Sequence, residues 1–424
     1  MGTGTSLTLG RDMARKKGQQ GVVARRSAGL GIDVPLLLIV ITLLIFGLLM
    51  VYSASTDYSA VILQEAPTYM FNRQVVWMLV GVFVMGLFAW INYHRWQIWA
   101  IPAMGVTILG LFAVLGINEV INNATRTIFG GSVQPSEAAK LMTVIYLSVW
   151  LYAKREQLAD VHFGLIPLGA ILGFLGGLIV VQPDLSAATT IFILGGILFF
   201  LAGSDLRQIA ILLVLGFAVG WLVFRVHPTG RERLDVYLAG LNDLTNAPVH
   251  LSRALEALVK GGWFGVGIGR AGTKLTGLPV PPTDSIFAVV GEETGILGAS
   301  SLVFLYVMLL WRGLHIANRA PDGLGKLMAA GLSIWLVMEA FINMAVLVGL
   351  VPFAGNALPF ISAGGSNLIA SLAAVGILMN ISRLSAQDKD MEERAFDAVV
   401  DLRRRDGRRR VSRPGRAPKS GSQK

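Results

Sequence analysis

The sequence of 424 residues contains no cysteine, which excludes disulfide bonds and thiolate metal sites. It is also poor in charge, because only 15% of its residues are charged while 54% are apolar. Soluble domains carry about 25% charged residues, so this balance excludes a water-soluble fold. The chain has instead long apolar stretches, and about 20 such residues suffice for a helix to cross a hydrocarbon core roughly 30 Å thick.

Ten apolar stretches predict transmembrane helices, whose backbone groups hydrogen bond within each segment. We therefore predict an all-α polytopic membrane protein with about ten spans. The first span is too long for a signal-peptide core, so we expect it to stay in the mature protein. The predicted spans are 34–52, 75–91, 98–117, 138–153, 164–181, 186–202, 207–225, 285–311, 328–350 and 359–381.

Lys and Arg residues gather in both tails and in alternate connections between spans. Since cytoplasmic segments retain positive charge, both termini are predicted to be cytoplasmic. The chain then divides into a basic N-terminal tail (1–33), a ten-span domain (34–383) and a basic, disordered C-terminal tail (384–424). The connection 226–283, between spans seven and eight, becomes a large extracytoplasmic loop. It carries six basic residues, but long loops translocate largely regardless of charge.

The C-terminal tail contains the basic run RRRDGRRR at 403–410. Beside a membrane, each such residue gains about 1 kcal/mol from anionic lipid headgroups. We expect this lipid contact and no nucleic acid, with a specific protein contact as the alternative. The Pro, Gly and Ser content after Ser412 predicts disorder at the end of the tail.

Ionisable residues at span ends are candidates for function, because charge is costly within a bilayer. Asp284 follows Pro281, Pro282 and Thr283 at the start of the eighth span. That pattern is typical of a helix cap, but a partly dehydrated carboxylate can also act as a general base. Asp184 starts the sixth span in a similar way, and capping is its leading interpretation.

Two further pairs of charged residues lie within predicted spans. Glu292 and Glu293 lie about two turns inside the eighth span, where they either brace neighbouring helices or face a polar cavity. Glu137 and Lys140 share one face of the fourth span, which predicts an ion pair.

The loop sequence KGGWFGVGIGRAGTKLTGLP combines five glycines in its first ten residues with the cations Lys260, Arg270 and Lys274. No strand precedes it, so a dinucleotide site is not expected. Two interpretations stay open: phosphate contact through backbone amides and cations, or a turn-rich loop. Near the end of the chain, Pro352, Pro359 and the 364–366 Gly-Gly-Ser interrupt an apolar segment, which favours a cleft.

Several ordered motifs together resemble the SEDS family (shape, elongation, division and sporulation) of bacterial membrane glycosyltransferases. GGWFG resembles its division branch, FtsW, more than its elongation branch, RodA. The matching stretches are YSAS at 52–55, Arg73 with Gln74 and Trp77, TRTIFGGSVQPSEAAK at 125–140, QPDL at 182–185, GGWFGVGIG at 261–269, PTDSIFAVVGEETGILG at 282–298, RAPD at 319–322, GLVPFAGNALPFIS at 349–362, 364–366 and ISR at 381–383.

The resemblance implies a SEDS-type fold that polymerises lipid II at the outer face of the bacterial cytoplasmic membrane, for septal synthesis. It implies Asp284 as the general base. Cations would contact the pyrophosphate, with Lys140 held by Glu137. The substrate-binding residues expected on this basis are Arg73, Arg126, Glu137, Lys140, Asp184, Arg270, Lys274, Glu292 and Ser362.

The resemblance also implies partners, namely a class B penicillin-binding protein and other divisome proteins. A divalent cation, Mg²⁺ or Mn²⁺, would suit the pyrophosphate, but the sequence offers no ligand cluster for it. The alternatives are a lipid II flippase and a RodA-type elongation polymerase. The chain departs from the family pattern at Pro282 (usually His), Ser186 and Ala187 (usually Gly-Thr), Ala363 (usually Tyr) and Glu339 (usually Gln).

Overall fold

The computed structural model describes residues 32–117, 134–242 and 247–406, and in these ranges the regular structure is helical, without β-strands. A π-helical turn, Tyr58–Ile62, extends the first helix, and a 3-10 turn, Tyr93–Arg95, precedes α4. The α-helices are α2 Val34–Asp57, α3 Tyr69–Trp90, α4 Trp96–Ile117, α5 Pro135–Lys154, α6 Leu165–Val180, α7 Leu185–Leu201, α8 Leu206–Val226, α9 Pro228–Asn242, α10 Val249–Gly261, α11 Ile286–Asn318, α12 Gly323–Leu347 and α13 Gly365–Asp406.

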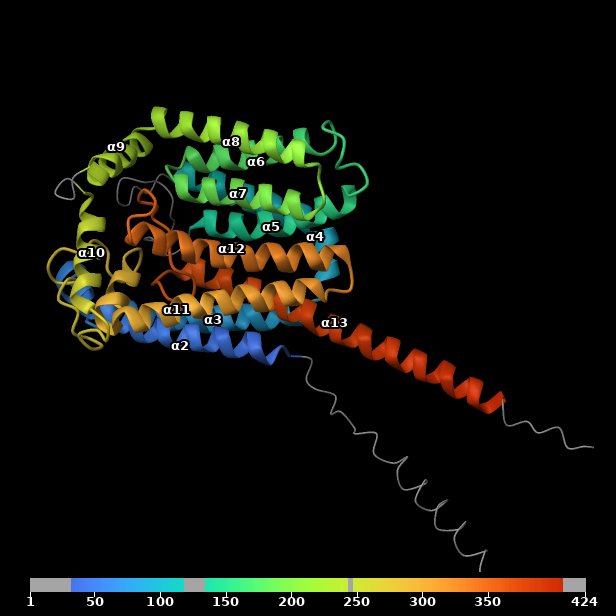
Figure 1. The fold of residues 1–424 in the computed structure, drawn as a ribbon. Helices are drawn as coiled ribbons and strands as arrows, with labels where there is room; N and C mark the ends of the chain where they lie inside the picture. Colours follow the sequence, from blue (N-terminus) through green and yellow to red (C-terminus); the bar gives the residue numbers. More distant parts are fainter. Residues whose placement is uncertain (1–31, 118–133, 243–246, 407–424) are drawn as a thin grey trace, which may run out of the picture.

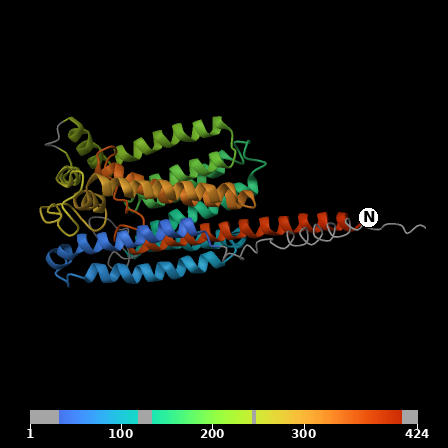
Figure 2. The same cartoon turned by 60° about the horizontal axis from the view of Figure 1, so that its bottom comes forward.

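Ten helices of this described part, α2 to α8 and α11 to α13, form one bundle, and each coincides with a predicted span (Figure 1). The two remaining helices, α9 and α10, cover one end of the bundle, which we call the loop end. At the opposite end, the terminal end, α2 begins and α13 leaves the bundle (Figure 2). The predicted all-α polytopic fold is therefore confirmed, and the large loop between spans seven and eight contains two helices of its own.

Seven helices in the described ranges are individually long and apolar enough to cross a membrane. The other three bundle helices are short or charged: α6 has 16 residues, α7 has 17, and α5 carries Glu137, Lys140 and Lys154. A helix of 16 residues rises only about 24 Å, less than the hydrocarbon core. These three helices therefore depend on their neighbours in the bundle to cross the bilayer.

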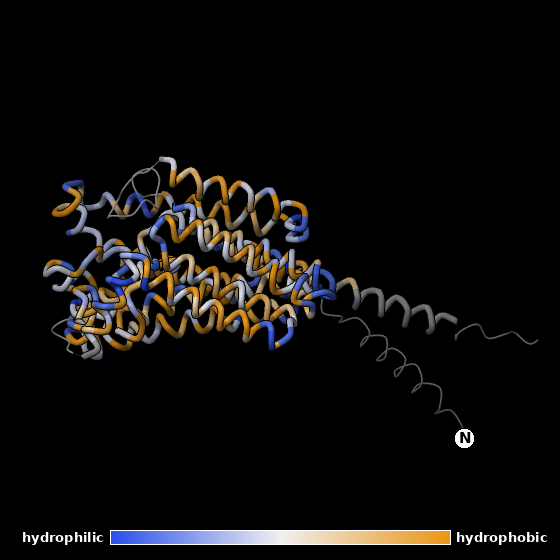
Figure 3. Tube along the Cα trace, turned by 90° about the horizontal axis from the view of Figure 1, so that it is seen from above, coloured by the Kyte–Doolittle hydropathy of each residue, from blue (hydrophilic) through white to orange (hydrophobic). Residues whose placement is uncertain are grey.

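The centre of the bundle is formed by α12 and α13, whose most apolar segments are 72% and 78% buried, against 6% for α8. The polar residues gather at the two ends of the bundle and apolar residues fill its length (Figure 3). Peripheral α8 exposes Leu213, Val214, Phe217 and Leu222. In a bilayer, lipid chains cover such a surface, so it needs no protein partner.

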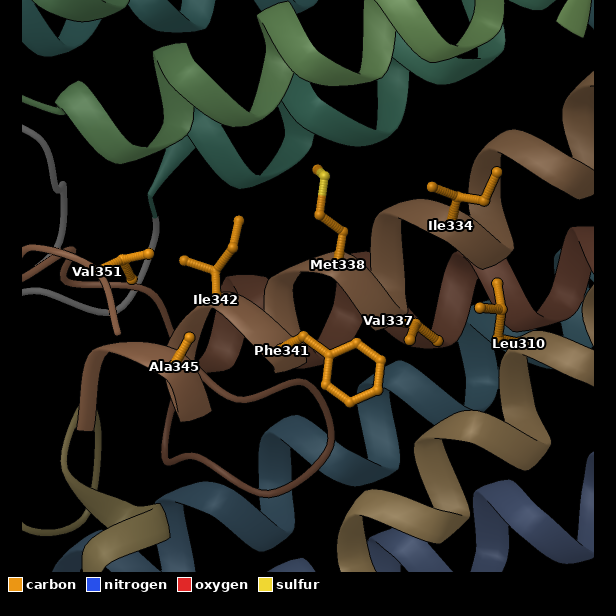
Figure 4. A pocket seen from close by; sticks show the side chains of 8 residues that line it. All are labelled: Leu310, Ile334, Val337, Met338, Phe341, Ile342, Ala345 and Val351. Atoms are coloured by element: carbon orange, nitrogen blue, oxygen red, sulfur yellow. The ribbon is translucent and has the colours of Figure 1, made fainter. Parts of the chain in front are cut away.

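An apolar groove of about 410 Å³ runs along α12 (Figure 4). Leu310 of α11 and Val351 close its two ends, and six residues of α12 line its floor. Lipid chains fill a groove of this kind at membrane depth as well as a protein side chain does. The α12 residues are Ile334, Val337, Met338, Phe341, Ile342 and Ala345.

The last helix is longer than the predicted span, since α13 continues to Asp406. The predicted C-terminal tail, 384–424, therefore begins as a continuation of α13. The residues after 406, with half of the basic run, lie outside the described residues, as does the N-terminal tail before residue 32.

Asp33 ties three helices together at the terminal end. Its carboxylate caps α2 at the Leu36 amide (3.1 Å) and accepts two hydrogen bonds from Arg312 of α11 (2.8 and 2.9 Å). The Ser382 hydroxyl of α13 donates a further one at 2.9 Å. Burial alone would raise the pKa of Asp33, but these hydrogen bonds outweigh it and hold that pKa below its usual value.

Arg312→Met is expected to lower the free energy of unfolding by about 3 kcal/mol at pH 7, since it leaves the buried Asp33 carboxylate unpaired. Because the pKa of Asp33 is depressed in the folded protein, its contribution is present above the ordinary aspartate pKa of about 3.9 and is lost as the pH falls below it. Thermal unfolding in detergent should therefore show that the difference in stability between wild type and variant becomes smaller as the pH is lowered. Arg319→Met, at an exposed arginine, is the control and should change little.

Candidate active site

The turn that carries Asp284 is held through its backbone. Its three consecutive carbonyls, from Pro282 to Asp284, all accept hydrogen bonds from α12 or from the α12–α13 connection. The donors are the Ala363 amide to Pro282 (2.8 Å), the Ser362 hydroxyl to Thr283 (2.7 Å) and the Asn343 side-chain amide to Asp284 (2.9 Å). These three hydrogen bonds thus fix the backbone of Asp284.

Asp284 is half-buried and precedes α11 rather than capping it. The helix begins at Ile286 with Ser285 in the N-cap position. The capping interpretation of Asp284 is therefore wrong for α11, because the N-cap position falls one residue later. The departures Pro282 and Ala363 lie in contact here, since the Ala363 amide donates to the Pro282 carbonyl.

Ser362 connects the Asp284 turn to α3. Its hydroxyl accepts from the Leu358 amide (2.8 Å) as it donates to Thr283. The Gln74 side chain of α3 donates to the Ser362 carbonyl (3.2 Å) and accepts from the Gly364 amide (3.2 Å). Half-buried Arg73 is the neighbour of Gln74 in α3. Ser362, predicted to bind substrate, thus has its hydroxyl engaged in positioning the turn.

A buried charged cluster lies one helical turn along α12 from Asn343. Lys140 Nζ lies 2.8 Å from Glu137 Oε1, as predicted, and also binds the carboxylate of Glu339. Asn367 of α13 donates to Glu137 (2.9 Å) and to Glu339 (3.4 Å). Since Glu339 and Asn343 share one face of α12, the same face positions both the cluster and the Asp284 turn.

Asp184 caps α7, as its leading interpretation predicted, by accepting from the Ala187 amide (3.2 Å). It also binds the start of α5, through the Ser136 hydroxyl (2.8 Å) and the Gln134 side chain (2.8 Å). The hydroxyl of Ser186, one of the departures, donates to the same carboxylate at 3.0 Å. Asp184 is 2% exposed, so its contacts with the described residues stabilise the fold.

Helix α11 is broken at Gly295, where φ is 69° and ψ is −171°. The glycine-rich loop satisfies the backbone groups on both sides of the break. Ile296 and Leu297 donate to the carbonyls of residues 262 and 263 (2.9 and 3.3 Å), and the amides of residues 266 and 267 donate to those of Glu292 and Glu293 (3.0 and 3.1 Å). Close backbone packing explains Gly261 and Gly265, and a positive φ explains Gly262, Gly267 and Gly269.

Gly295→Ala is expected to destabilise the protein by about 2 kcal/mol or more, because a Cβ there combines a positive φ with overpacking. The added atom would lie 2.5 Å from the Gly265 nitrogen and the Trp263 oxygen. Thermal unfolding and proteolysis of the loop measure the effect. Gly169→Ala, where a Cβ meets nothing within 4 Å, should leave both unchanged; equal losses in the two variants would contradict this account.

Phosphate contact was one of the two interpretations of the glycine-rich loop. In the structure the carboxylate of Glu292 occupies the loop amides that such a phosphate would bind. Its carboxylate accepts the Gly272 amide (2.9 Å) and the Thr273 amide (3.2 Å), together with the Thr273 hydroxyl. Successive amides form a good anion site, but here the protein's own carboxylate fills it. Glu292 therefore braces the loop, whereas the first interpretation expected it to brace neighbouring helices.

Lys274 is enclosed in a second ionic cluster. Its Nζ lies 3.7 Å from Glu293 and 3.6 Å from Asp57, and it donates to the Ser53 carbonyl (3.0 Å) and the Gly269 carbonyl (3.2 Å). The side chain is 5% exposed. Lys274 thus ties the loop to α2 and α11 and is poorly placed to contact a substrate.

The structure brings some of the predicted residues together and separates others. Ser362 binds the turn that carries Asp284, and Lys140, with Glu137, binds Glu339, one helical turn of α12 from Asn343. Arg270 is exposed in the glycine-rich loop, and Arg126 lies outside the described residues. Within the described ranges, no three His, Asp or Glu side chains gather as ligands for a divalent cation.

The membrane domain matches the family model described as "Cell cycle protein", which names FtsW, RodA and SpoVE, over residues 34–387. The chain belongs to this family. It is 36% identical over 357 residues to a Geobacter sp. (strain M18) protein named "Probable peptidoglycan glycosyltransferase FtsW", covering 83% of this chain and 97% of that one. It is 34% identical over 358 residues to "Stage V sporulation protein E" of Bacillus subtilis (strain 168), covering 82% and 97%.

Solved structures of the FtsW/RodA/SpoVE family have the same fold. The chain superposes with a TM-score of 0.70 and 26% identity on a chain of "Structural coordination of polymerization and crosslinking by a peptidoglycan synthase complex", covering 84% of this chain and 99% of that one. It superposes on the rod shape determining protein RodA of Thermus thermophilus with a TM-score of 0.62 and 26% identity, covering 84% and 98%. The predicted SEDS-type fold is confirmed.

Proposed function

We propose that this chain is a peptidoglycan glycosyltransferase that polymerises lipid II. The observation that carries the proposal is the Asp284 turn, whose three backbone clamps present a half-buried carboxylate at the loop end. Relatives named peptidoglycan glycosyltransferase that match along more than four-fifths of this chain support it.

In the proposed reaction, Asp284 accepts the proton of the 4-hydroxyl of an acceptor N-acetylglucosamine. That oxygen attacks the anomeric carbon of the donor N-acetylmuramic acid. A C–O bond forms there as the bond to the lipid pyrophosphate breaks, and the pyrophosphate leaves with the electron pair. A positioned base contributes about a hundredfold to ten-thousandfold to such a step.

The candidates for pyrophosphate contact narrow to three arginines. Lys140 and Lys274 are enclosed by carboxylates, so their charge serves the fold. Arg73 lies beside the Gln74 that helps to position the Asp284 turn, and Arg270 is exposed in the glycine-rich loop. We assign the pyrophosphate to these two, together with Arg126, because guanidinium groups bind phosphate oxygens in a bidentate manner.

We place the loop end outside the bacterial cytoplasmic membrane and both termini in the cytoplasm. Lys and Arg residues in the tails and in the connections of the terminal end support this orientation. Asp284 would then meet the disaccharide of lipid II on the outer face.

We further propose a class B penicillin-binding protein as the partner that cross-links the glycan, within a division complex with other divisome proteins. The likeness to a chain of a peptidoglycan synthase complex supports such a partner. Similarity to relatives named FtsW supports division rather than elongation.

Purified protein with its partner transpeptidase, given fluorescent lipid II in detergent, should produce glycan polymer. Vesicles with lipid II in the inner leaflet test the flippase alternative. Polymer in detergent supports the proposal, whereas outward movement of lipid II without any polymer would overturn it.

A further inference from the structure

One stretch of the glycine-rich loop, residues 262–268, presents apolar side chains away from the protein. Trp263 is 67% exposed, Phe264 83% and Ile268 51%. Large exposed aromatic side chains in one short segment typically mark a surface that meets a membrane or another protein. The bundle core does not use them.

The loop holds these side chains in a fixed place. Its backbone is bonded to both sides of the Gly295 break, and the Cβ position of Gly265 lies 2.2 Å from the Glu293 carbonyl, so only glycine permits this packing. The segment that follows is bonded to Glu292 through Gly272 and Thr273. Trp263 and Phe264 therefore cannot turn inward without breaking this backbone pairing.

The height of the loop along the bundle follows from two polar clusters. At the terminal end Asp33 binds Arg312, and towards the loop end the Ser53 hydroxyl binds Glu293 (2.5 Å). The twenty residues of helix from Asp33 to Ser53 rise about 30 Å, which matches the thickness of the hydrocarbon core. The backbone pairing of the loop with Glu293 therefore lies at the level of a bilayer boundary.

The exposed loop residues continue the lipid-facing surface of α11. Ile296 and Leu297, just past the break, are 47% and 54% exposed, and Leu297 donates to the Trp263 carbonyl. Phe304 continues this exposed apolar side further along α11, at 60%. Aromatic side chains are enriched at the headgroup level of membranes.

We propose that the glycine-rich loop is an interfacial membrane anchor, with Trp263 and Phe264 inserted among lipids at the boundary nearer the loop end. Lipid, rather than protein, covers them because they adjoin the exposed side of a membrane span. The anchor fixes the segment of α11 before Gly295, and with it the Asp284 turn, at a set height above the hydrocarbon core.

The absence of cysteine allows a direct test, because a single introduced cysteine carries the only label. Phe264→Cys and, separately, Trp263→Cys are labelled with an environment-sensitive fluorophore. The full-length protein is reconstituted without a partner into vesicles of phosphatidylethanolamine and phosphatidylglycerol, with nitroxide lipids labelled near the headgroup or deep in the chain. Phe304→Cys is the control within the membrane, and Glu232→Cys, exposed on α9, is the control in water.

Both loop probes should be quenched several-fold more strongly by the shallow nitroxide than the Glu232 probe, and more by the shallow than by the deep nitroxide. The Phe304 probe should show the reverse depth preference. Loop probes that behave like the Glu232 probe would overturn the proposal. Shielding that appears only after the transpeptidase partner is added would also overturn it, in favour of a protein contact.

Discussion

Asp284→Ala is expected to reduce glycan polymerisation by at least about a hundredfold, because it removes the proposed general base. The fold should be retained, since α12 and the α12–α13 connection hold the backbone carbonyls of this turn, and the variant keeps those hydrogen bonds. Asp284→Asn should behave in the same way, as an amide of the same shape cannot accept the proton. Polymer length and rate from fluorescent lipid II, measured beside thermal unfolding, give both answers.

The matched control for Asp284 is Asp235→Ala, which removes a 57% exposed carboxylate from α9. It should leave polymerisation and unfolding temperature near their wild-type values. Wild-type rates of polymer formation by Asp284→Ala would show that another group accepts the proton. A loss of partner binding by that variant would instead point to a structural role.

Lys140→Met is expected to destabilise the protein by about 4 kcal/mol, because it leaves two carboxylates in a buried site without their cation. Glu137 and Glu339 each lose a hydrogen bond, while Asn367 still donates to both. The unfolding temperature in detergent and the yield of folded protein report this loss. Polymerisation should fall as well, since the cluster lies one turn of α12 from Asn343.

Glu339→Gln is the informative counterpart, because it leaves one lysine facing one carboxylate. The amide keeps the shape and hydrogen-bonding capacity of the side chain, so the free energy of unfolding should change by no more than about 1 kcal/mol. If Glu339→Gln were as damaging as Lys140→Met, the cluster would depend on both carboxylates. The glutamate at 339, where the family usually has Gln, would then be essential to this chain.

The bundle could be predicted from the sequence because membrane spans are local. Each apolar run must satisfy its own backbone in lipid, so hydropathy alone placed all ten helices. The Asp184 cap and the Glu137–Lys140 pair were equally local, with partners three residues apart. The break at Gly295 was not predicted, because the groups that satisfy it come from another part of the chain.

The same reasoning explains why the enclosure of Lys274, which was expected to bind substrate, was not predicted. Of its two partners, Asp57 lies far before Lys274 in the sequence and Glu293 lies after it, so no spacing rule connects them. Asn343, which holds the Asp284 backbone, was also missed. A signal for the Lys140 cluster was available, because Glu339 is a carboxylate in an apolar span, and such a residue requires a partner.

The break in α11 bears on how the protein is inserted into the membrane during synthesis. An unbroken helix from Ile286 to Asn318 would rise about 50 Å, while the part after Gly295 rises about 35 Å, close to one bilayer. The loop that satisfies the break precedes α11 in the chain, so it leaves the ribosome first. The segment that fixes the position of α11 along the bilayer is thus synthesised before α11 itself. Gly295 determines where the membrane span begins.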